Sequence, residues 1–279
     1  MDSCHSLLSC SDLDYVKIGK LLGVGGVKAV YHAQWKGLDV ALSVLNNHKY
    51  ESDFLSGMQN IKEFQQNPFT IQAIGFCFEE KMYLSEFHRN GDASTLEKVL
   101  RTKAQDGIHL RFKLCYNYVQ ILTSLHHARF TNGSSMPPKV LCDSNNLDKL
   151  LSQLLFTDDL SLVLNDMDAL PTVGIGGIKC GHKPLKGNFV APEQRWNSSE
   201  EYDDALMMGY DEKTDIWKVP SVCSHFLDSM KGREAVEDEL KPIHEQCHHT
   251  NPKKRPTAFE ILTYYENVRK LVEKISLMD

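Results

Sequence analysis

The sequence predicts an α+β protein with a strand-rich N-terminal lobe, residues 1–87, and a helical C-terminal lobe, residues 88–279. Two observations support this fold class. In the first part, short apolar segments such as 40–45 are bounded by glycine and asparagine turns, as in antiparallel sheets. In the second part, apolar residues recur at helical spacing, most clearly over 112–125. Because no internal repeat or low-complexity linker separates the parts, we expect a single two-lobed domain spanning 1–279.

The N-terminal lobe is predicted to contain a sheet and one helix. We expect strands at 16–22, 27–35, 40–45, 70–76 and 81–87, with a glycine turn between the first two. Phe54, Met58 and Ile61 fall on one face of a helix over 54–64, and Ser52 stands where an N-cap is expected.

The C-terminal lobe is predicted to be mainly helical, with three short strand-like segments. Helices are expected at 96–100 and 112–127, and strand-like segments at 140–141, 154–156 and 162–164. From Ala191 onward the pattern is again mostly helical, and we expect Pro242, Pro252 and Pro256 to mark helix boundaries.

Composition limits the possible classes of function. The chain has 42% hydrophobic and 24% charged residues, as in ordinary globular proteins. A net charge of −6 argues against nucleic-acid binding, which needs a basic face. No apolar run approaches the roughly 18–20 residues that span a bilayer.

The cysteines leave the compartment open. Eight cysteines in 279 residues are too few for a disulfide scaffold and also occur in cytosolic enzymes. However, Cys4 and Cys10 lie in a short N-terminal arm that a covalent link could hold. Asn132 and Asn197 begin glycosylation sequons in polar stretches, which is compatible with a secretory compartment.

Five short motifs follow one another in the order found in protein kinases. They are Cys142-Asp143-Ser144-Asn145, Asp166-Met167-Asp168, Ala191-Pro192-Glu193, Asp215-Ile216-Trp217 and Arg255-Pro256-Thr257. Each motif alone is weak evidence, but their order along the chain resembles the order of motifs in protein kinases. That resemblance implies a structural ion pair between Glu193 and Arg255, and an Asp215 that braces the catalytic-loop backbone.

The phosphate-binding lysine departs from the usual kinase pattern. Ser43 stands where the third strand normally carries this lysine, but Lys28 and Val30 share one face of the second strand. The with-no-lysine kinases place their lysine at the position of Lys28, so we predict that Lys28 contacts the phosphates. The acidic partner is undecided, because the expected glutamate falls at Gly57.

Three nearby acids remain alternatives for that partner. They are Glu51, Asp53 and Glu63, and the sequence does not choose among them.

Phosphoryl transfer needs one carboxylate to orient the hydroxyl and others to hold the metal ion. Asp143 is predicted to take the first role and Asp166 the second. Gln153 takes the place of the metal-binding asparagine if the catalytic loop is about five residues longer than usual, although a plain surface glutamine is the alternative. Asp168, in place of a glycine, would add a carboxylate near the metal.

The kinase resemblance also implies ATP and Mg²⁺, or Mn²⁺, as cofactors. The glycine-rich turn would let backbone N–H groups approach the phosphates. The ATP-binding residues that we expect are Gly23, Gly25, Gly26, Lys28, Val30, Ala41 and Glu86.

Several longer strings are more specific than general kinase motifs. They are Gly26-Val27-Lys28, Val40-Ala41-Leu42-Ser43, the Cys142–Asn145 motif, the segment 165–171, Lys179-Cys180-Gly181-His182 and the segment 211–218. In these strings the chain resembles the protein O-mannose kinase family over nearly its whole length.

The resemblance implies an enzyme of the endoplasmic reticulum lumen that phosphorylates the 6-hydroxyl of mannose. The acceptor would be an O-linked GalNAc-GlcNAc-mannose trisaccharide on α-dystroglycan. The family's type II membrane anchor does not appear in this chain, and a monomer is expected. The resemblance also implies that some of Cys4, Cys10, Cys180 and Cys247 form disulfides, without giving the pairs.

Two other functions are compatible with the departures. The first is a catalytically inactive pseudokinase scaffold, suggested by Ser43, Gly57 and the Leu141-Cys142 pair that replaces His-Arg. The second is a with-no-lysine-type kinase that acts on serine or threonine. Asp143, Asp166 and Lys28 count against the scaffold, and an acceptor assay separates the two kinase alternatives.

Activity is predicted not to require phosphorylation of the activation segment. Cys142 replaces the arginine that reads the loop phosphate in regulated kinases, and Thr172 is the only hydroxyl amino acid in 169–189. Mass spectrometry of active protein should find Thr172 unmodified, and Thr172→Ala should keep its activity. Turnover that depends on phosphate at Thr172 would contradict this prediction.

Overall fold

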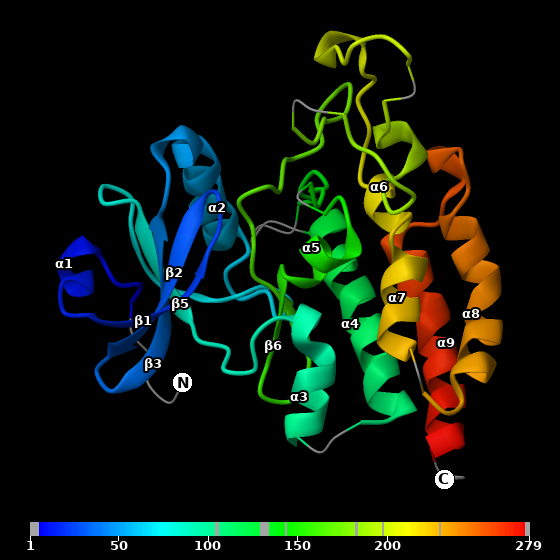
Figure 1. Ribbon diagram of the computed structural model, residues 1–279, viewed down its shortest axis with the longest axis horizontal. Helices are drawn as coiled ribbons and strands as arrows, with labels where there is room; N and C mark the ends of the chain where they lie inside the picture. The colour runs from blue at the N-terminus through cyan, green and yellow to red at the C-terminus, as the bar shows by residue number, and fades with distance from the viewer. Residues whose placement is uncertain are drawn as a thin grey trace. The chain divides into compact units, whose positions relative to one another are not determined.

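The computed structural model describes residues 6–103, 106–128, 134–142, 144–181, 184–196, 198–228 and 230–276. The chain divides into two compact units (Figure 1). We call Met1–Arg89 with Val163–Leu170 the N-terminal unit, and Asn90–Leu162 with Pro171–Asp279 the C-terminal unit.

The N-terminal unit is built on a five-stranded antiparallel sheet in the order β1-β2-β3-β5-β4. Its strands are β1 (Lys17–Val24), β2 (Lys28–Trp35), β3 (Leu38–Leu45), β4 (Ala73–Cys77) and β5 (Met82–Glu86). In the register between β2 and β3, Lys28 lies opposite Leu45 and Val30 opposite Ser43. Ser43, at the position that usually carries the kinase lysine, therefore lies next to β2, the strand that carries Lys28.

The N-terminal arm is fixed to this sheet. Trp35, Val40 and Leu84 belong to a buried cluster on which Leu8 and the short helix α1 (Cys10–Leu13) pack. Leu8 pairs with β4 through backbone hydrogen bonds, and a disulfide joins Cys10 to Cys77. The expected covalent link therefore exists, with a partner that the sequence did not indicate; Cys4 lies outside the described residues.

Helix α2 (Glu51–Glu63) has the predicted apolar face. Phe54, Met58 and Ile61 are fully buried, and the Phe54 ring lies 5.8 Å from that of Tyr83 in β5. The predicted N-cap at Ser52 is wrong, because the helix already begins at Glu51 after a one-turn 3₁₀ helix, His48–Tyr50.

The segment Val163–Leu170 belongs to the N-terminal unit although it comes late in the chain. It continues from strand β7 (Leu162–Leu164), and Leu164 exchanges backbone hydrogen bonds with Phe69 and Ile71. The side-chain amide of Asn60 in α2 also donates to the carbonyl of Met167 at 2.9 Å. These hydrogen bonds hold the segment that contains Asp166 and Asp168 next to α2.

The C-terminal unit is mainly helical. Its elements are α3 (Leu96–Lys103), α4 (Ile108–His126), α5 (Leu147–Leu151), β6 (Leu154–Phe156), α6 (Lys213–Ile216), α7 (Val219–Leu227), α8 (Arg233–Cys247) and α9 (Ala258–Ser276). Helix α4 packs against both α7 and α9 (Figure 1). Leu114, Val119 and Leu122 of α4 have no exposed surface, so this helix forms the centre of the unit.

Several boundary predictions were wrong in this unit. Residues 140–141 form no strand, and only a single bridge from Lys139 to Thr172 lies beside them. Pro242 does not end a helix, because it lies inside α8. The segment after the Asp143 motif forms helix α5, which Asn146 caps through its side chain. Within the described ranges, none of the helices has the length and apolar character needed to cross a bilayer.

Candidate active site

The glycine-rich turn connects β1 to β2 and ends directly before Lys28. The Gly25 N–H donates to the Lys28 carbonyl at 2.8 Å, and the Asn46 side chain donates to the Gly25 carbonyl at 2.9 Å. Gly23, Gly25 and Gly26 are all exposed. Their exposed backbone is compatible with the predicted approach of phosphates.

The Lys28 side chain is buried and forms two ion pairs. Its Nζ lies 2.8 Å from Asp166 Oδ1 and 2.8 Å from Asp168 Oδ2. Asp168 is almost completely buried, whereas the Asp166 side chain keeps 23% of its surface exposed. The three groups therefore form a compact charged cluster within the N-terminal unit, and Asp166 is its more accessible carboxylate.

The surroundings shift the ionisation of this cluster. Burial alone would lower the pKa of Lys28, but the charges of Asp166 and Asp168 outweigh it and raise this pKa well above its usual value. Burial raises the pKa of Asp168 to about 6, although Lys28 opposes the change. The two carboxylates thus favour the charged form of Lys28.

Ordinary kinases have a large glutamate at the position of Gly57 and a small glycine at the position of Asp168. In this chain the small residue and the large residue are interchanged. A Cβ added to Gly57 would collide with Asp168 Oδ1 and would lie 3.1 Å from the Asp168 Cα. Asp168 therefore fills the space beside α2 that a side chain at position 57 would enter. The acids weighed from the sequence, Glu51, Asp53 and Glu63, are not the residues with which Lys28 forms these ion pairs.

The other predicted nucleotide-binding residues belong to the same sheet. Ala41 and Ser43 are buried on β3, and Val30 on β2 is half-buried. Glu86 ends β5, where its carboxylate accepts a hydrogen bond from the Gln72 N–H at 3.1 Å. The sheet thus carries Lys28, Val30, Ala41 and Glu86 within one unit.

Asp215 is the centre of a buried network in the C-terminal unit. Its carboxylate accepts from the Leu141 N–H at 3.0 Å and lies 3.3 Å from His126 Nε2 and 3.2 Å from Lys218 Nζ. Burial opposes ionisation of Asp215, but the Lys218 charge and these hydrogen bonds hold its pKa below the usual value. Asp215 therefore fixes the backbone two residues before Asp143.

Both sides of the Asp143 position are held. Lys218 also donates to the Ser144 hydroxyl and, at 3.3 Å, to the Leu141 carbonyl. On the other side, Cys142 forms a disulfide with Cys180. Asp143 itself lies outside the described residues. Of the cysteines that the resemblance implied could pair, Cys180 is bonded to Cys142, whereas Cys247 is free and buried.

Gln153 follows helix α5 and is buried. Its N–H donates to the Leu150 carbonyl at 3.0 Å, which closes the last turn of that helix. The plain surface glutamine weighed from the sequence is therefore wrong. Its predicted role as a metal ligand remains a prediction.

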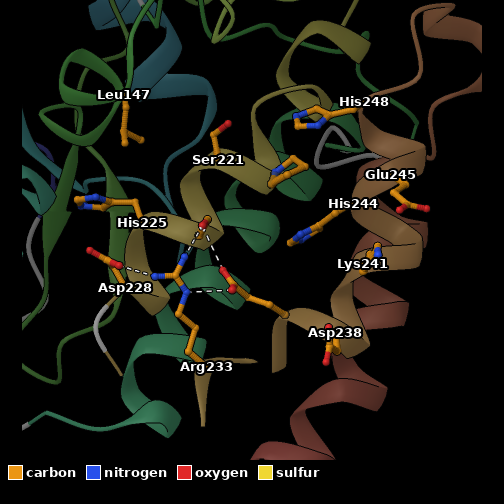
Figure 2. Close-up of a pocket in the computed structure, with 13 residues that line it drawn as sticks. Leu147, Ser221, His225, Asp228, Arg233, Asp238, Lys241, His244, Glu245 and His248 are labelled. Carbon is orange, nitrogen blue, oxygen red and sulfur yellow. Dashed lines mark hydrogen bonds and ion pairs between the residues drawn. The ribbon is translucent and has the colours of Figure 1, made fainter. Parts of the chain in front are cut away.

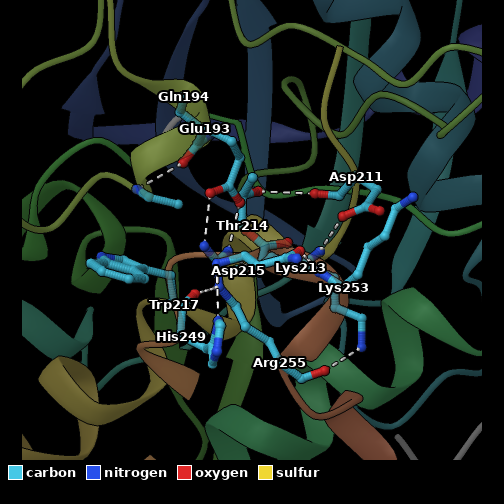
Figure 3. A network of polar contacts seen from close by, with 12 residues as sticks. Glu193, Gln194, Asp211, Lys213, Thr214, Asp215, Trp217, His249, Lys253 and Arg255 are labelled. Atoms are coloured by element: carbon cyan, nitrogen blue, oxygen red, sulfur yellow. Dashed lines mark hydrogen bonds and ion pairs between the residues drawn. The ribbon is translucent and has the colours of Figure 1, made fainter. Parts of the chain in front are cut away.

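The remaining predicted pair fixes a separate part of the C-terminal unit (Figure 3). The Arg255 guanidinium donates to both Glu193 carboxylate oxygens, at 2.6 and 2.7 Å, and to the carbonyls of His249 and Lys213. It also lies 5.1 Å from the centre of the Trp217 ring. This bidentate pair connects the segment before α6 to the segment before α9.

Sequence reasoning missed three features of these sites. They are Asp168 as a partner of Lys28, the Lys218 and His126 contacts of Asp215, and the disulfide partners Cys77 and Cys142. The first had a signal in the sequence: a glycine stands where glutamate is expected, and an aspartate stands where glycine is expected. The others depend on contacts between distant segments, and no local pattern reports them.

The carboxylates of the N-terminal unit fit a divalent cation. Mg²⁺ binds through oxygen ligands, often one or two carboxylates together with phosphate oxygens. The Asp166 carboxylate keeps 23% of its side-chain surface exposed, and the Lys28 ammonium beside it can contact phosphate oxygens. This donor set suits a magnesium–phosphate group.

Comparison with known proteins first defines the class. No protein-family model matches the chain. A probable serine/threonine-protein kinase of Dictyostelium discoideum is 23% identical over 277 residues, which cover 92% of this chain and 16% of that protein. With the antiparallel N-terminal sheet and the helical C-terminal unit, this likeness identifies a protein-kinase-like two-lobed fold.

More similar relatives define the family. Protein O-mannose kinase of Homo sapiens is 39% identical over 277 residues, covering 96% of this chain and 77% of the relative. The proteins of that name from Xenopus laevis and Gallus gallus are 39% and 38% identical and cover 98% and 99% of this chain, and 78% and 79% of the relatives. The chain belongs to the protein O-mannose kinase family, and is therefore a phosphotransferase by family.

Gly57→Ala is predicted to disturb the Lys28 cluster. Helix propensity alone would make this change stabilising by about 1 kcal/mol. Because the new Cβ would displace Asp168, we expect a lower thermal unfolding midpoint instead, since overpacking costs about 1–3 kcal/mol. Transfer activity should fall with it. Ser56→Ala, at the exposed neighbouring position of α2, is the control. A Gly57→Ala protein with higher stability and full activity would contradict the assignment.

Proposed function

We propose that this chain transfers the γ-phosphoryl group of ATP to the 6-hydroxyl of mannose in an O-linked glycan. The proposed acceptor is the GalNAc-GlcNAc-mannose trisaccharide on α-dystroglycan. Membership of the protein O-mannose kinase family supports the reaction class. The observation that favours an active kinase over a scaffold is the buried Lys28 ammonium, held by Asp166 and Asp168.

In this proposal the N-terminal unit binds ATP. Gly23, Gly25 and Gly26 offer backbone N–H groups to the phosphates, and Lys28 contacts the phosphate oxygens. Val30, Ala41 and Glu86 are assigned to the adenine side. Because Asp166 and Asp168 keep Lys28 charged and oriented, its position does not depend on a glutamate from α2.

Asp166 is proposed to hold the metal ion, Mg²⁺ or Mn²⁺, with Gln153 as the second protein ligand. When bound, the ion neutralises charge on the β- and γ-phosphates. The Asp168 side chain is more buried than that of Asp166. Its proposed role is therefore to position Lys28 and not to bind the metal ion.

Asp143 is proposed to orient the mannose 6-hydroxyl and to accept its proton. The oxygen of that hydroxyl forms a bond to the γ-phosphorus, while the bond from this phosphorus to the bridging oxygen of ADP breaks. The contacts of Leu141 and Ser144 with Asp215 and Lys218 support this role, since they hold the Leu141 backbone and the Ser144 side chain on the two sides of Asp143.

The proposed location is the lumen of the endoplasmic reticulum, with a type II membrane anchor outside this chain. The disulfides Cys10–Cys77 and Cys142–Cys180 support an oxidising compartment. A monomer and no nucleic-acid partner are proposed with it; the net charge of −6 supports the latter. The acceptor asparagines of the two sequons, Asn132 and Asn197, lie outside the described residues.

Asp143→Ala is expected to lower phosphoryl transfer to the trisaccharide by at least ~10²-fold, because it removes the group that positions the hydroxyl and accepts its proton. The measurement uses labelled ATP, a divalent cation and the free trisaccharide, with serine- and threonine-containing peptides as competing acceptors. Unchanged thermal unfolding of the variant is the control for folding.

Three results would contradict the proposal. Near-normal turnover of folded Asp143→Ala would remove the catalytic assignment. Preferential transfer to the peptides would favour the with-no-lysine-type protein kinase. No transfer by the unmodified protein to any O-mannosyl acceptor would favour the scaffold.

A further inference from the structure

Five buried side-chain atoms have no hydrogen-bond partner among the described residues. They are Tyr83 Oη, His88 Nε2, Tyr118 Oη, Asp168 Oδ1 and His225 Nε2. His88 Nε2 lies 3.2 Å from Glu86 Oε1, and Tyr118 belongs to α4. His225 lines an open groove between α7 and α8, which Figure 2 shows. Tyr83 and Asp168 are the pair that concerns the candidate active site, because both interact electrostatically with Lys28.

Tyr83 lies on the face of the sheet that carries Lys28. Its register partner on β3 is Ser43, and the register partner of Ser43 on β2 is Val30. Residues directly opposite each other in antiparallel strands share a face, and Lys28 is two positions from Val30. The four side chains therefore lie on one face, and Tyr83 is completely buried there.

Helix α2 connects Tyr83 with Asp168. The Phe54 ring lies 5.8 Å from the Tyr83 ring, and Gly57 follows Phe54 by three residues, so Phe54 and Gly57 share one face of the helix. Asp168 Oδ1 occupies the place that a Cβ of Gly57 would take. Tyr83 and Asp168 therefore pack against the same face of α2.

The Tyr83 hydroxyl is a suitable donor for this carboxylate. Burial raises the pKa of Tyr83, and Lys28 and Ser43 only partly oppose the change, so the hydroxyl keeps its proton at pH 7. Lys28 already binds Asp168 Oδ2, which leaves Oδ1 for a second donor. A buried donor and a buried acceptor without partners are both unfavourable, so an arrangement that satisfies the two together is favoured.

A water molecule can join the two atoms. Internal water in proteins typically forms two to four hydrogen bonds to buried polar groups that protein atoms do not satisfy. Here it would accept from the Tyr83 hydroxyl and donate to Asp168 Oδ1, and the buried Ser43 hydroxyl on the same face offers a third partner. Serine at position 43, in place of the usual lysine, leaves space for this molecule beside Tyr83.

We propose that Tyr83 is a positioning residue of the phosphotransfer site. A buried water molecule connects its hydroxyl to Asp168, and Asp168 in turn holds Lys28 toward the phosphates of ATP. This inference rests on the proposed function, because it extends the role assigned there to Lys28. It places the support of the phosphate-binding lysine on β5, where the sequence motifs give no indication of it.

Tyr83→Phe tests the inference, because it removes the hydroxyl and keeps the ring. If the hydroxyl were simply unsatisfied, its removal would raise the thermal unfolding midpoint. We expect instead a midpoint that is lower by roughly 2–4 °C, as for the loss of one hydrogen bond. We also expect kcat/KM for ATP to fall roughly tenfold, the effect of losing one hydrogen bond to a charged group. KM for the trisaccharide should not change, since Tyr83 acts on the phosphate side of the reaction.

The matched control is Tyr31→Phe, on the opposite face of the same sheet. Tyr31 is three positions from Lys28 on β2 and packs on the cluster that contains Trp35, so its hydroxyl is remote from the Lys28 face. Its removal should leave ATP affinity and transfer unchanged. Asp168→Asn completes a double-mutant cycle with Tyr83→Phe. In the Asp168→Asn protein, Tyr83→Phe should have little further effect on kcat/KM for ATP, because both residues act on Lys28 through one bridge.

Two results would overturn the inference. The first is a Tyr83→Phe protein with a higher unfolding midpoint and full affinity for ATP. The second is a cycle in which the effects of Tyr83→Phe and Asp168→Asn simply add, because the role of Tyr83 would then be independent of Asp168. ATP affinity is measured by calorimetry with MgATP and no acceptor. Absence of transfer to any O-mannosyl acceptor, together with normal MgATP binding, would therefore count against the proposed function instead.

Discussion

The ion pairs of Lys28 with Asp166 and Asp168 are the interaction on which the candidate active site depends. A buried ammonium is costly unless carboxylates compensate it, and here two carboxylates lie 2.8 Å away. The arrangement requires Gly57, because a side chain there would displace Asp168. It also requires Asn60, which holds the Met167 carbonyl between the two aspartates. Loss of the usual strand lysine and loss of the usual helix glutamate are thus parts of one rearrangement.

In the C-terminal unit, too, a buried charge beside the catalytic loop is compensated by an opposite charge and hydrogen bonds. Asp215 is completely buried, and it is tolerated because Lys218, His126 and a backbone N–H satisfy it. The network, together with the Cys142–Cys180 disulfide, holds both residues next to Asp143. These contacts support the prediction that activity does not require phosphorylation of the activation segment.

Much of the fold could be predicted from the sequence, because apolar residues at every second position, or at helical spacing, indicate the buried face of a strand or helix. The strands β2, β3 and β5 and the helices α2 and α4 lie close to their predicted ranges. Pro242 was wrongly predicted as a boundary, since packing of the apolar face of α8 outweighs the loss of one backbone hydrogen bond. The ordered motifs predicted the Glu193–Arg255 pair and the contact of Asp215 with the catalytic-loop backbone, and both are present. The roles of Lys28 and Asp166 in binding phosphate and metal stay predictions. The pairing of Lys28 with Asp168 had a signal in the sequence, because Gly57 and Asp168 both depart from the kinase pattern, but that signal was missed. The pairing of Cys142 with Cys180 could not be predicted, because it joins segments that only the tertiary fold brings together.

The most direct test of the central claim compares Lys28→Ala with Ser43→Ala in the same assay. ATP affinity, transfer to the trisaccharide and the thermal unfolding midpoint are measured for both variants. The account predicts that Lys28→Ala loses transfer by at least ~10²-fold, because the phosphates lose their cation, while Ser43→Ala keeps most of its activity. Because removing Lys28 also leaves buried carboxylates unpaired, the unfolding midpoint shows how much of its loss is structural. Equal activity of the two folded variants, or greater loss from Ser43→Ala, would contradict the account.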